Sequence, residues 1–332
     1  MTRTLTSTHH SIREMSQTVA HGPRSALPVE PNPVRASALS AAARAPLALH
    51  GHHVRRLERV VDFVDAHLDA ELSLDRMATL ASISPFHFHR LFHRWSGETL
   101  NEFVRRRRLE MAAGRLRHCP EEKITAISLS CGFSSPEGFA RAFRERFGMT
   151  PSCWRNGGWA AGRAPADDRG LRHVPRITVT REPPLDVLYM RDRGDFGLAP
   201  ALWERFMGAV HAMGLAGQPL LFMGLDDPSI AGPDRCRMDA CVQLPPSAAA
   251  ALPAPPLLHK RVPARWVATL QYDGPAEDIA EGWEAMLFQW LPQAPFRLAI
   301  GPFFERYDPA HGAPGGGAVH CRLGMPVEPR VC

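Results

Sequence analysis

The chain of 332 residues lacks the features that mark membrane-spanning and secreted proteins. No run of eighteen apolar residues occurs, which excludes a membrane span. The first ten residues, MTRTLTSTHH, contain no apolar core of the kind found in secretory signals, so we expect no such signal. The seven cysteines form no CxxC pair, which argues against a zinc ribbon and against a disulfide scaffold. We therefore expect a protein of the reducing cytoplasm.

Lysine is nearly absent, because Lys123 and Lys260 are its two occurrences and arginine carries almost all of the positive charge. Genomic base composition is the simplest explanation for this bias. The charges are unevenly distributed, however. Residues 54–156 contain 17 basic and 13 acidic side chains, whereas residues 174–332 contain 14 and 17. The basic front half allows a polyanionic partner, although this charge alone does not establish one.

Composition divides the chain into four segments. Residues 1–50 are rich in Ser, Thr, Ala and His and contain five prolines, which predicts a disordered tail. Residues 51–156 show helical periodicity, and residues 157–173 have the Gly, Ala and Arg content of a flexible linker. Residues 174–332 contain strand-like runs. We expect a multidomain protein with an all-α domain followed by an α+β domain.

A helix–turn–helix pattern occurs twice in the all-α segment. Apolar spacing, serine caps and terminal glycines predict helices over 54–68, 73–81, 85–96, 100–117, 124–129, 137–147 and 151–154. Ser84-Pro85 and Ser135-Pro136 stand at the same point of the two patterns, 51 residues apart. The segment therefore contains two helix–turn–helix units joined by one long helix.

The second helix of each unit has a polar outer face suited to DNA. The major groove of B-DNA admits one α-helix and presents a base-specific pattern of hydrogen-bonding groups. Arg90 can bind guanine in a bidentate manner, and His87 and His89 can donate to bases or phosphates. Glu137 can accept from cytosine, and Arg141 can bind guanine or phosphate. The long helix would hold the two second helices about 34–36 Å apart, one turn of DNA, so that they enter two adjacent major grooves.

Two other polar clusters allow different interpretations. The run Arg105–Arg108 points around a full helical turn, so its members can pair with Glu102 and Glu110 or contact DNA phosphates. His89 and His93 have an i, i+4 spacing that zinc can use, but no cysteine or carboxylate completes a ligand set. We expect no metal and no cofactor.

Residues 54–156 resemble the DNA-binding domain of the AraC/XylS family of transcription regulators. The matching text is SPFHFHRLFHRWSGETLNEFVRRRRLEMAAGRL (84–116) and ITAISLSCGFSSPEGFARAFRERFGMTPSCWR (124–155). The resemblance implies double-stranded DNA and RNA polymerase as partners. It also implies DNA contacts at Phe86, His87, His89, Arg90, Ser135, Pro136, Glu137 and Arg141.

Residues 174–332 contain an internal repeat. Gly194 and Gly274 each end an apolar strand, and Trp-Glu follows nine residues later in both halves. Each half is expected to form a strand–helix–strand–strand unit, and two such units would enclose a cleft for a small ligand. The strand-like runs are 177–180, 187–190 and 266–270, and the helix-like runs are 199–213 and 277–290.

This segment resembles the GyrI-like effector-binding domain, which has a duplicated βαββ fold. The matching text is LWERF (202–206), CRMDACVQLP (236–245), YDGPAEDIAEGWEAMLFQWLP (272–292), FFERYDP (303–309) and HCRLGMPV (320–327). The resemblance implies a cleft that binds amphipathic, often cationic small molecules through aromatic rings and a carboxylate. The residues that it assigns to effector binding are Glu305, Tyr307, Phe196, Trp203, Trp283 and Phe303.

Some of these assignments have structural alternatives. Trp203 and Trp283 are also candidates for the hydrophobic core, and Glu305 could form a salt bridge with Arg306. The sequence Gly194-Asp195-Phe196 stands where such domains have Gly-Pro-Tyr, so the aromatic ring is kept and the hydroxyl is lost.

These features together predict a sequence-specific DNA-binding transcription regulator controlled by a small amphipathic effector, without enzymatic activity. Two alternatives stay open for the GyrI-like segment. It could hydrolyse small electrophiles with Glu305 and Tyr307, although no nucleophile–base arrangement accompanies them, or it could bind another protein. A concave pocket would favour a small ligand, and a flat apolar patch would favour a protein. The operator, the effector and the choice between activation and repression are not predicted.

Overall fold

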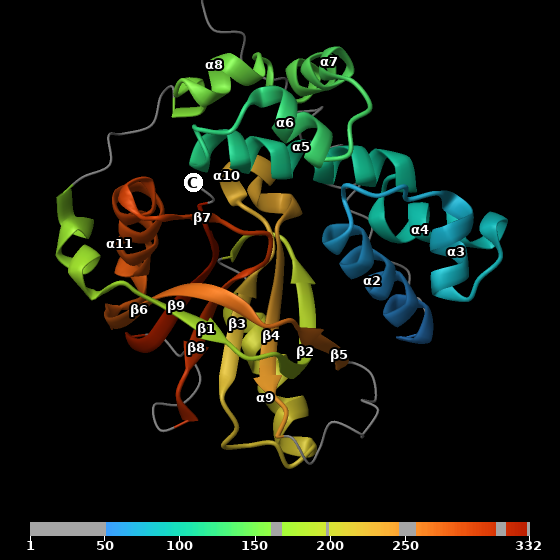
Figure 1. Ribbon diagram of the computed structural model, residues 1–332. Helices are drawn as coiled ribbons and strands as arrows, with labels where there is room; N and C mark the ends of the chain where they lie inside the picture. Colours follow the sequence, from blue (N-terminus) through green and yellow to red (C-terminus); the bar gives the residue numbers. More distant parts are fainter. Residues whose placement is uncertain (1–50, 161–167, 197–198, 246–256, 310–316, 331–332) are drawn as a thin grey trace, which may run out of the picture. The chain divides into compact units, whose positions relative to one another are not determined.

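Figure 1 shows the computed structural model of the chain. The structure describes residues 51–160, 168–196, 199–245, 257–309 and 317–330. The predicted disordered tail, residues 1–50, lies outside the described residues, as do residues 161–167 of the predicted linker.

The first part of the described chain is helical, as the sequence predicts. Its helices are α2 (Gly51–Ala66), α3 (Leu74–Ala81), α4 (Pro85–Ser96), α5 (Leu100–His118), α6 (Ile124–Ser130), α7 (Pro136–Phe147) and α8 (Pro151–Arg155). α3 and α4 form the first helix–turn–helix unit, and α6 and α7 form the second. α5 connects the two units and is the longest helix of this part.

Local sequence signals determine where these helices begin and end. The Ser73 hydroxyl accepts a backbone N–H at the start of α3, and Thr99 and Glu102 form a reciprocal capping box at the start of α5. Gly97 and Gly148 follow α4 and α7 with φ angles of 80° and 73°, a left-handed conformation that glycine adopts without strain.

Each helix–turn–helix unit has its own hydrophobic core. The first core joins α2, α3, α4 and the start of α5 around Phe88, Phe92 and Phe103. The second core joins the rest of α5 to α6, α7 and α8 around Phe139. Ile230, from the second part of the chain, also belongs to this second core.

The second part of the chain contains an antiparallel sheet. Its strands are β1 (Thr178–Glu182), β2 (Leu185–Arg193), β3 (Leu220–Gly224), β4 (Arg237–Gln243), β5 (Leu258–Val262), β6 (Arg265–Pro275), β7 (Phe296–Leu298), β8 (Phe303–Tyr307) and β9 (Ala318–Pro329). The order is β1-β6-β9-β8-β3-β4-β2-β5, with β7 paired to β9. Two residues separate β1 from β2, and two separate β5 from β6. These two short connections lead from one half of the sheet to the other.

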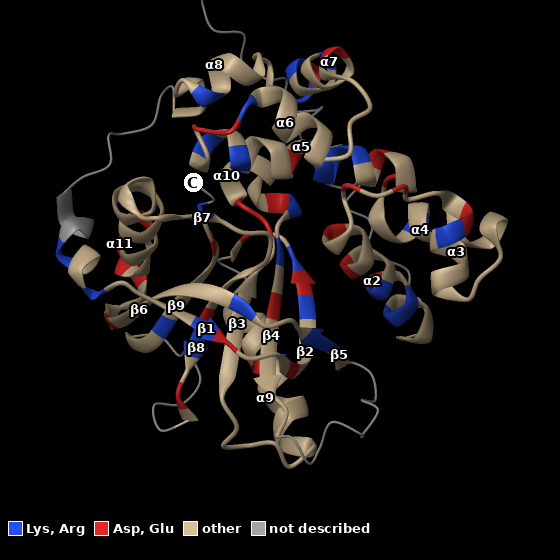
Figure 2. Ribbon diagram, viewed as in Figure 1, with Lys and Arg blue, Asp and Glu red and all other residues tan. Residues whose placement is uncertain are grey.

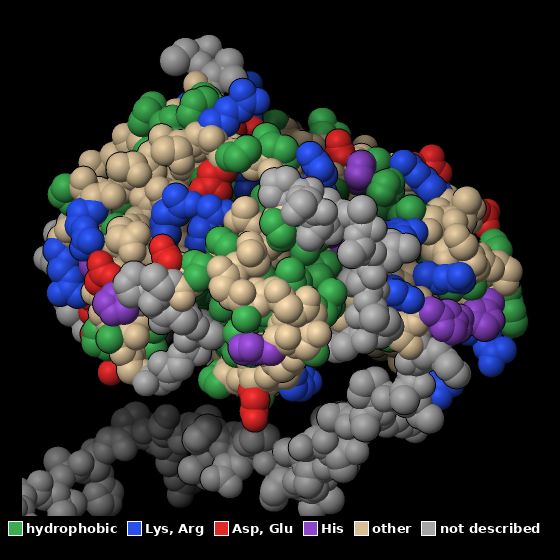
Figure 3. Space-filling model, turned by 90° about the horizontal axis from the view of Figure 1, so that it is seen from below, with side chains coloured by type: hydrophobic (Ala, Val, Ile, Leu, Met, Phe, Trp, Pro, Cys, Tyr) green, Lys and Arg blue, Asp and Glu red, His purple; other side chains and the backbone are tan. Residues whose placement is uncertain are grey.

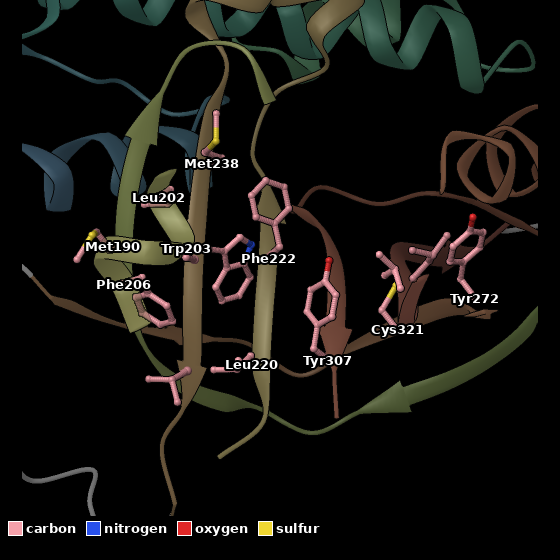
Figure 4. Packing of buried hydrophobic residues seen from close by; sticks show 14 of the residues in the cluster. Met190, Leu202, Trp203, Phe206, Leu220, Phe222, Met238, Tyr272, Tyr307 and Cys321 are labelled. Carbon is pink, nitrogen blue, oxygen red and sulfur yellow. The ribbon is translucent and has the colours of Figure 1, made fainter. Parts of the chain in front are cut away.

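Helices cover one face of this sheet. The first half follows the predicted strand–helix–strand–strand order, and the second half adds the short strand β7 between its helix and its last two strands. α9 (Ala199–Ala212) lies between β2 and β3, and α11 (Ile279–Glu284) follows β6 and continues into the π-helical turn η7 (Ala285–Trp290). The larger core lies between the sheet and these helices (Figure 4). A smaller core, with Val187 and Phe304, lies on the opposite face, because alternate strand residues face opposite sides.

Several short helices connect the larger elements. They are η1 (Gly158–Ala160), η2 (Asp168–Arg176), α10 (Pro228–Ala231), η4 (Pro233–Arg235), η6 (Ala276–Asp278) and η8 (Leu291–Gln293). η2 lies partly in the predicted linker, where Arg172 forms an ion pair with Glu281 at 2.6 Å and His173 is buried. Among the described residues, no helix combines the length and the hydrophobicity required to cross a bilayer.

Candidate DNA-binding and effector-binding sites

Four of the predicted DNA contacts lie on the exposed side of α4. Phe86 is 73% exposed, and His87, His89 and Arg90 are exposed as well. Phe88 is fully buried and holds the opposite side of the helix in the first core. The Arg90 guanidinium lies 5.7 Å from the centre of the Phe86 ring, one helical turn away. The structure thus brings these four residues to one solvent-facing surface.

The four predicted contacts of α7 divide into two pairs. Ser135 and Pro136 are half-buried, and the Ser135 hydroxyl accepts the Gly138 N–H at 3.1 Å, so these two residues shape the start of the helix. Glu137 and Arg141 are exposed one turn apart. The outer surface of α7 therefore presents fewer of the predicted side chains than that of α4.

All four members of the arginine run on α5 bind groups within the protein, three of them with little exposure. Arg106–Arg108 donate hydrogen bonds to carboxylates or carbonyl oxygens. Glu110 accepts from two of them, as expected, whereas Glu102 instead closes the capping box of α5. Arg105 keeps a side chain that is 55% exposed and pairs with Glu145 at 2.6 Å. Of this run, Arg105 is therefore the residue best placed to contact a phosphate.

The start of α2 adds histidines that the sequence analysis did not assign to the DNA surface. The rings of His52 and His53 lie 4.0 Å apart, and His53 lies 5.9 Å from His87 of α4, measured between ring centres. Figure 3 shows histidine side chains gathered beside basic ones on the right, where Figure 1 places α2 to α4. The dense histidines of residues 50–53 were the sequence signal for this cluster.

Glu305 lies on β8, in the helix-covered face of the sheet. Its side chain points to the same side as Phe303 and Tyr307, because alternate strand residues share a face. The Tyr307 hydroxyl donates a hydrogen bond to Glu305 Oε2, and the Trp283 side chain forms a second hydrogen bond to this carboxylate. Burial raises the pKa of Glu305, and these two hydrogen bonds oppose that rise.

The predicted aromatic residues surround this carboxylate. Trp283 stacks on Phe303 with 5.5 Å between ring centres, and both rings are half-buried. Trp203 meets Tyr307 edge-on at 5.8 Å and is 5% exposed, as expected of a core residue (Figure 4). Phe196 meets Phe222 edge-on at 6.0 Å.

Phe222, which the sequence analysis did not single out, connects Phe196 to the other rings. It lies opposite Glu305 in the pairing of β3 with β8 and belongs to the same core as the other aromatic residues. The structure therefore brings all six residues assigned to effector binding into one region of the fold.

Glu305 has no positively charged partner among the described residues. Arg306, the partner considered from the sequence, points to the opposite face of the sheet, where its guanidinium donates to Gln243 at 3.4 Å. A half-buried carboxylate that is surrounded by aromatic rings and lacks a counter-charge can receive an organic cation.

Two surface hollows lie away from this carboxylate. One, of about 550 Å³, is bordered by the α2–α3 connection, by Arg105 and Arg108 of α5, and by Phe133. The other, of about 280 Å³, lies beside the β1–β2 turn and is bordered by Arg306 and Arg322. Neither is the cleft expected between the two halves, since neither is lined by Glu305 or by the aromatic residues around it.

Both halves of the described chain match known families. Residues 77–157 match the model of a helix-turn-helix domain, and residues 175–328 match the model of a GyrI-like small molecule binding domain. The regulatory protein SoxS of Salmonella typhimurium is 34% identical over 104 residues, which are 31% of this chain and 96% of SoxS. The transcriptional regulator Rob of the same organism is 36% identical over 100 residues, 30% of this chain and 34% of Rob.

Solved structures also include similar chains. A transcriptional regulator from Chromobacterium violaceum, of the AraC type, is 28% identical, with a TM-score of 0.30, and the match covers 33% of this chain and 95% of that chain. From its sequence matches, the chain belongs to the AraC family of DNA-binding transcription regulators and carries a GyrI-like small-molecule binding domain. The predicted fold class and family are thereby confirmed.

Proposed function

We propose that this regulator reads a specific DNA sequence through α4 and α7 and is controlled by an amphipathic organic cation bound at Glu305. The observation that carries the effector class is the carboxylate itself, which is half-buried among aromatic rings and has no counter-charge in the described part of the chain. The GyrI-like domain then acts as a binding domain without catalysing a reaction.

The chemistry of the site favours a cation over a neutral ligand. A cation next to Glu305 stabilises the ionised carboxylate and gains attraction from the faces of neighbouring rings. Trp283 and Phe303 are half-buried, whereas Trp203 and Tyr307 are buried. We therefore assign Trp283 and Phe303 to the entrance, where they move aside for the ligand, and the other two to the floor.

On the DNA side, α4 supplies Phe86, His87, His89 and Arg90, and α7 supplies Glu137 and Arg141. We expect the two helices to enter adjacent major grooves, because the long helix α5 connects the two helix–turn–helix units. Ser135 and Pro136 set the start of α7 and thereby the position of its first turn. Because the family consists of transcription regulators, we also propose RNA polymerase as a partner and the cytoplasm as the place of action.

Selection from a random DNA library with the full chain tests the DNA half of this proposal. We expect an enriched motif with two parts about 10 base pairs apart, the repeat of adjacent major grooves. Binding that falls steeply with salt and enriches no sequence would contradict sequence-specific recognition.

Titration with tetraphenylphosphonium, a lipophilic cation, tests the effector half. We expect Glu305→Gln to weaken its binding to the full chain at least about tenfold, because interactions with a charged group contribute roughly 1.5–3 kcal/mol. Glu204→Gln, which changes an exposed glutamate of α9, is the matched control and should bind as the wild type does.

A neutral ligand of similar shape separates charge from hydrophobicity. Triphenylphosphine oxide should bind the wild type more weakly than the cation does and should be indifferent to Glu305→Gln. Equal affinity of the wild type and Glu305→Gln for tetraphenylphosphonium would remove Glu305 from the effector site.

A further inference from the structure

The loop that follows β3 is held against α5 by buried ion pairs. Asp226, two residues after the end of β3, pairs with Arg107 of α5 and with Arg237 of β4, the latter at 2.8 Å. Asp227 pairs with Arg117 of α5 at 2.9 Å. The Asp226 and Arg237 side chains are 2% and 4% exposed. Removing one partner of such a buried ion pair leaves an uncompensated charge and is strongly destabilising. These ion pairs therefore hold the loop in a defined position against α5.

The short helix α10 continues this contact into the core of the second DNA-reading unit. Asp227 begins α10 by accepting the Ser229 N–H at 2.8 Å. Ile230 is 6% exposed and packs in the core of α5, α6 and α7. The Arg146 side chain of α7 donates to the Ala231 carbonyl at 3.4 Å. A piece of the GyrI-like domain is thus part of the hydrophobic core beneath α7.

A second set of ion pairs reaches the first unit through α2. Arg191 of β2 pairs with Glu58 at 2.5 Å and with Asp62 at 2.9 Å. Arg237 of β4, which holds Asp226, also pairs with Asp65 at 2.6 Å. Figure 2 shows red, acidic segments on α2 and blue, basic segments on β2. α2 and α5 are therefore both held by the same sheet and its β3–β4 connection.

One strand connects these contacts to the candidate effector site. Phe222 of β3 lies opposite Glu305, and a Cβ at Gly224 would lie 3.5 Å from the Phe196 ring. Asp226 follows two residues later. At roughly 3.3 Å per residue, Phe222 and Asp226 are about 13 Å apart along the strand direction. A displacement of the rings around Glu305 therefore acts on the same short segment that holds α5.

We propose that β3 and α10 couple the effector site to α5 and thereby change the relative placement of the two DNA-reading helices. Because buried ion pairs have discrete arrangements, a shift of β3 is transmitted as a change of partners at Asp226, between Arg107 and Arg237. This inference rests on the proposed function, since it takes Glu305 as the effector site. It gives the signal a path that does not depend on the segment 157–173.

Reciprocity of coupling gives a test that needs no effector. If the two sites are coupled, DNA binding must alter β3 as the effector alters DNA binding. The full chain is compared by hydrogen exchange with and without the duplex that it enriches from the random library. We expect amide exchange in β3 and β8 to change about fivefold or more on DNA binding, the lower range of typical couplings. Unchanged exchange in both strands of the wild type would overturn the proposal.

Three variants locate the path. Asp226→Asn keeps the shape of the side chain and removes the charge that binds Arg107 and Arg237, so the response of β3 to DNA should fall at least about threefold. Arg117→Met, which releases Asp227, provides a second break should Asp226→Asn fail to fold. Asp186→Asn, which removes exposed pairs with His259 and Arg261, is the control and should respond as the wild type does. A full response in a folded Asp226→Asn or Arg117→Met protein would exclude this path.

The same assay separates this proposal from the choice of effector class. If tetraphenylphosphonium does not bind but DNA still changes amide exchange in β3, the proposed class of effector is wrong and the proposed coupling is retained. Binding of the cation without any DNA response at β3 or β8 would retain the effector site and reject the coupling.

Discussion

The carboxylates on and beside the strands next to β3 differ in whether cationic side chains compensate their charge. Asp226 and Asp239, at the contact with α2 and α5, are each bound by two cationic side chains. Burial opposes their ionisation, but Arg107 and Arg237 hold the pKa of Asp226 well below its usual range. Arg191 and Lys260 likewise lower the pKa of Asp239 to about 2, against burial. Glu305 has no such partners in the described residues, and burial raises its pKa.

This difference separates a structural carboxylate from the one that we propose binds the effector. A buried carboxylate with its counter-charges supplied by the fold is fully compensated and joins elements together. A half-buried carboxylate without one retains an unfavourable ionised state that a ligand of opposite charge relieves. The cations around Asp239 thus compensate its buried charge, whereas the ionised form of Glu305 stays uncompensated, as the proposed effector site requires.

We expect the largest effect on stability from the removal of a carboxylate that has cationic partners. Asp239→Asn leaves Arg191 and Lys260 buried with less opposing charge, and we expect it to lower the free energy of unfolding by about 3–5 kcal/mol. Urea denaturation at pH 7 measures this loss. A loss below about 1 kcal/mol would show that the Asp239 pairs contribute no more than surface salt bridges do.

The stability that Asp239 contributes should also depend on pH. Its pKa is about 2 in the folded chain and near 3.9 in the unfolded chain, so its contribution is present above about pH 4 and is lost as the pH falls towards 2. The difference in stability between the wild type and Asp239→Asn should therefore shrink over this range in urea denaturations at stepped pH. A difference that stays constant down to pH 2 would contradict the lowered pKa.

The contrast between side chains with and without charged partners also applies to arginine, and it predicts an effect of intermediate size on DNA binding. Arg107 is buried among carboxylates, whereas Arg90 is exposed and forms no ion pair in the described structure. We expect Arg90→Ala to leave thermal stability unchanged and to weaken binding to the selected DNA by about 1–3 kcal/mol, with relaxed preference at one base position. A repeated library selection measures the preference.

A neighbouring arginine provides the control for this measurement. Arg94→Ala, on the next turn of α4, should weaken binding less and leave the preference intact. If Arg90→Ala lowers affinity equally for all sequences, Arg90 contacts phosphate and does not read a base.

The smallest effect is expected from Glu305→Gln on stability, and it has the opposite sign. Because the folded chain raises the pKa of Glu305, ionisation of this group destabilises the fold as the pH rises from the unfolded pKa, near 4.3, through the raised folded value. Glu305→Gln should therefore be slightly more stable than the wild type at pH 7 and no more stable below pH 4. A destabilised variant at pH 7 would place Glu305 with the structural carboxylates.

Local patterns in the sequence predicted most of the helical part and the order of the sheet part. α4 begins at Pro85 and ends before Gly97, as predicted, because its cap and its glycine act within one turn. The predicted helix over 277–290 is divided into η6, α11 and the π-helical turn η7, a change that apolar spacing does not reveal. α10 was not predicted, since four residues are too short for a periodic signal.

The candidate site residues show a similar division. Apolar spacing on α4 distinguished buried Phe88 from exposed His87 and Arg90 correctly, because burial on an amphipathic helix follows its period. The arginine run of α5 could not be assigned in this way. Arg107 binds Asp226, 119 positions away, and no local pattern contains that partner.

The sequence by itself determined the family, the two helix–turn–helix units, the duplicated sheet and the identity of the aromatic and acidic residues around β8. These features depend on caps, periodicity and motifs, which act over a few residues. The tertiary structure alone decided which carboxylates are paired with cationic side chains and which, like Glu305, are not. Asp65 and Arg237 are 172 positions apart, so the balance between desolvation and ion pairing arises when the folded elements meet.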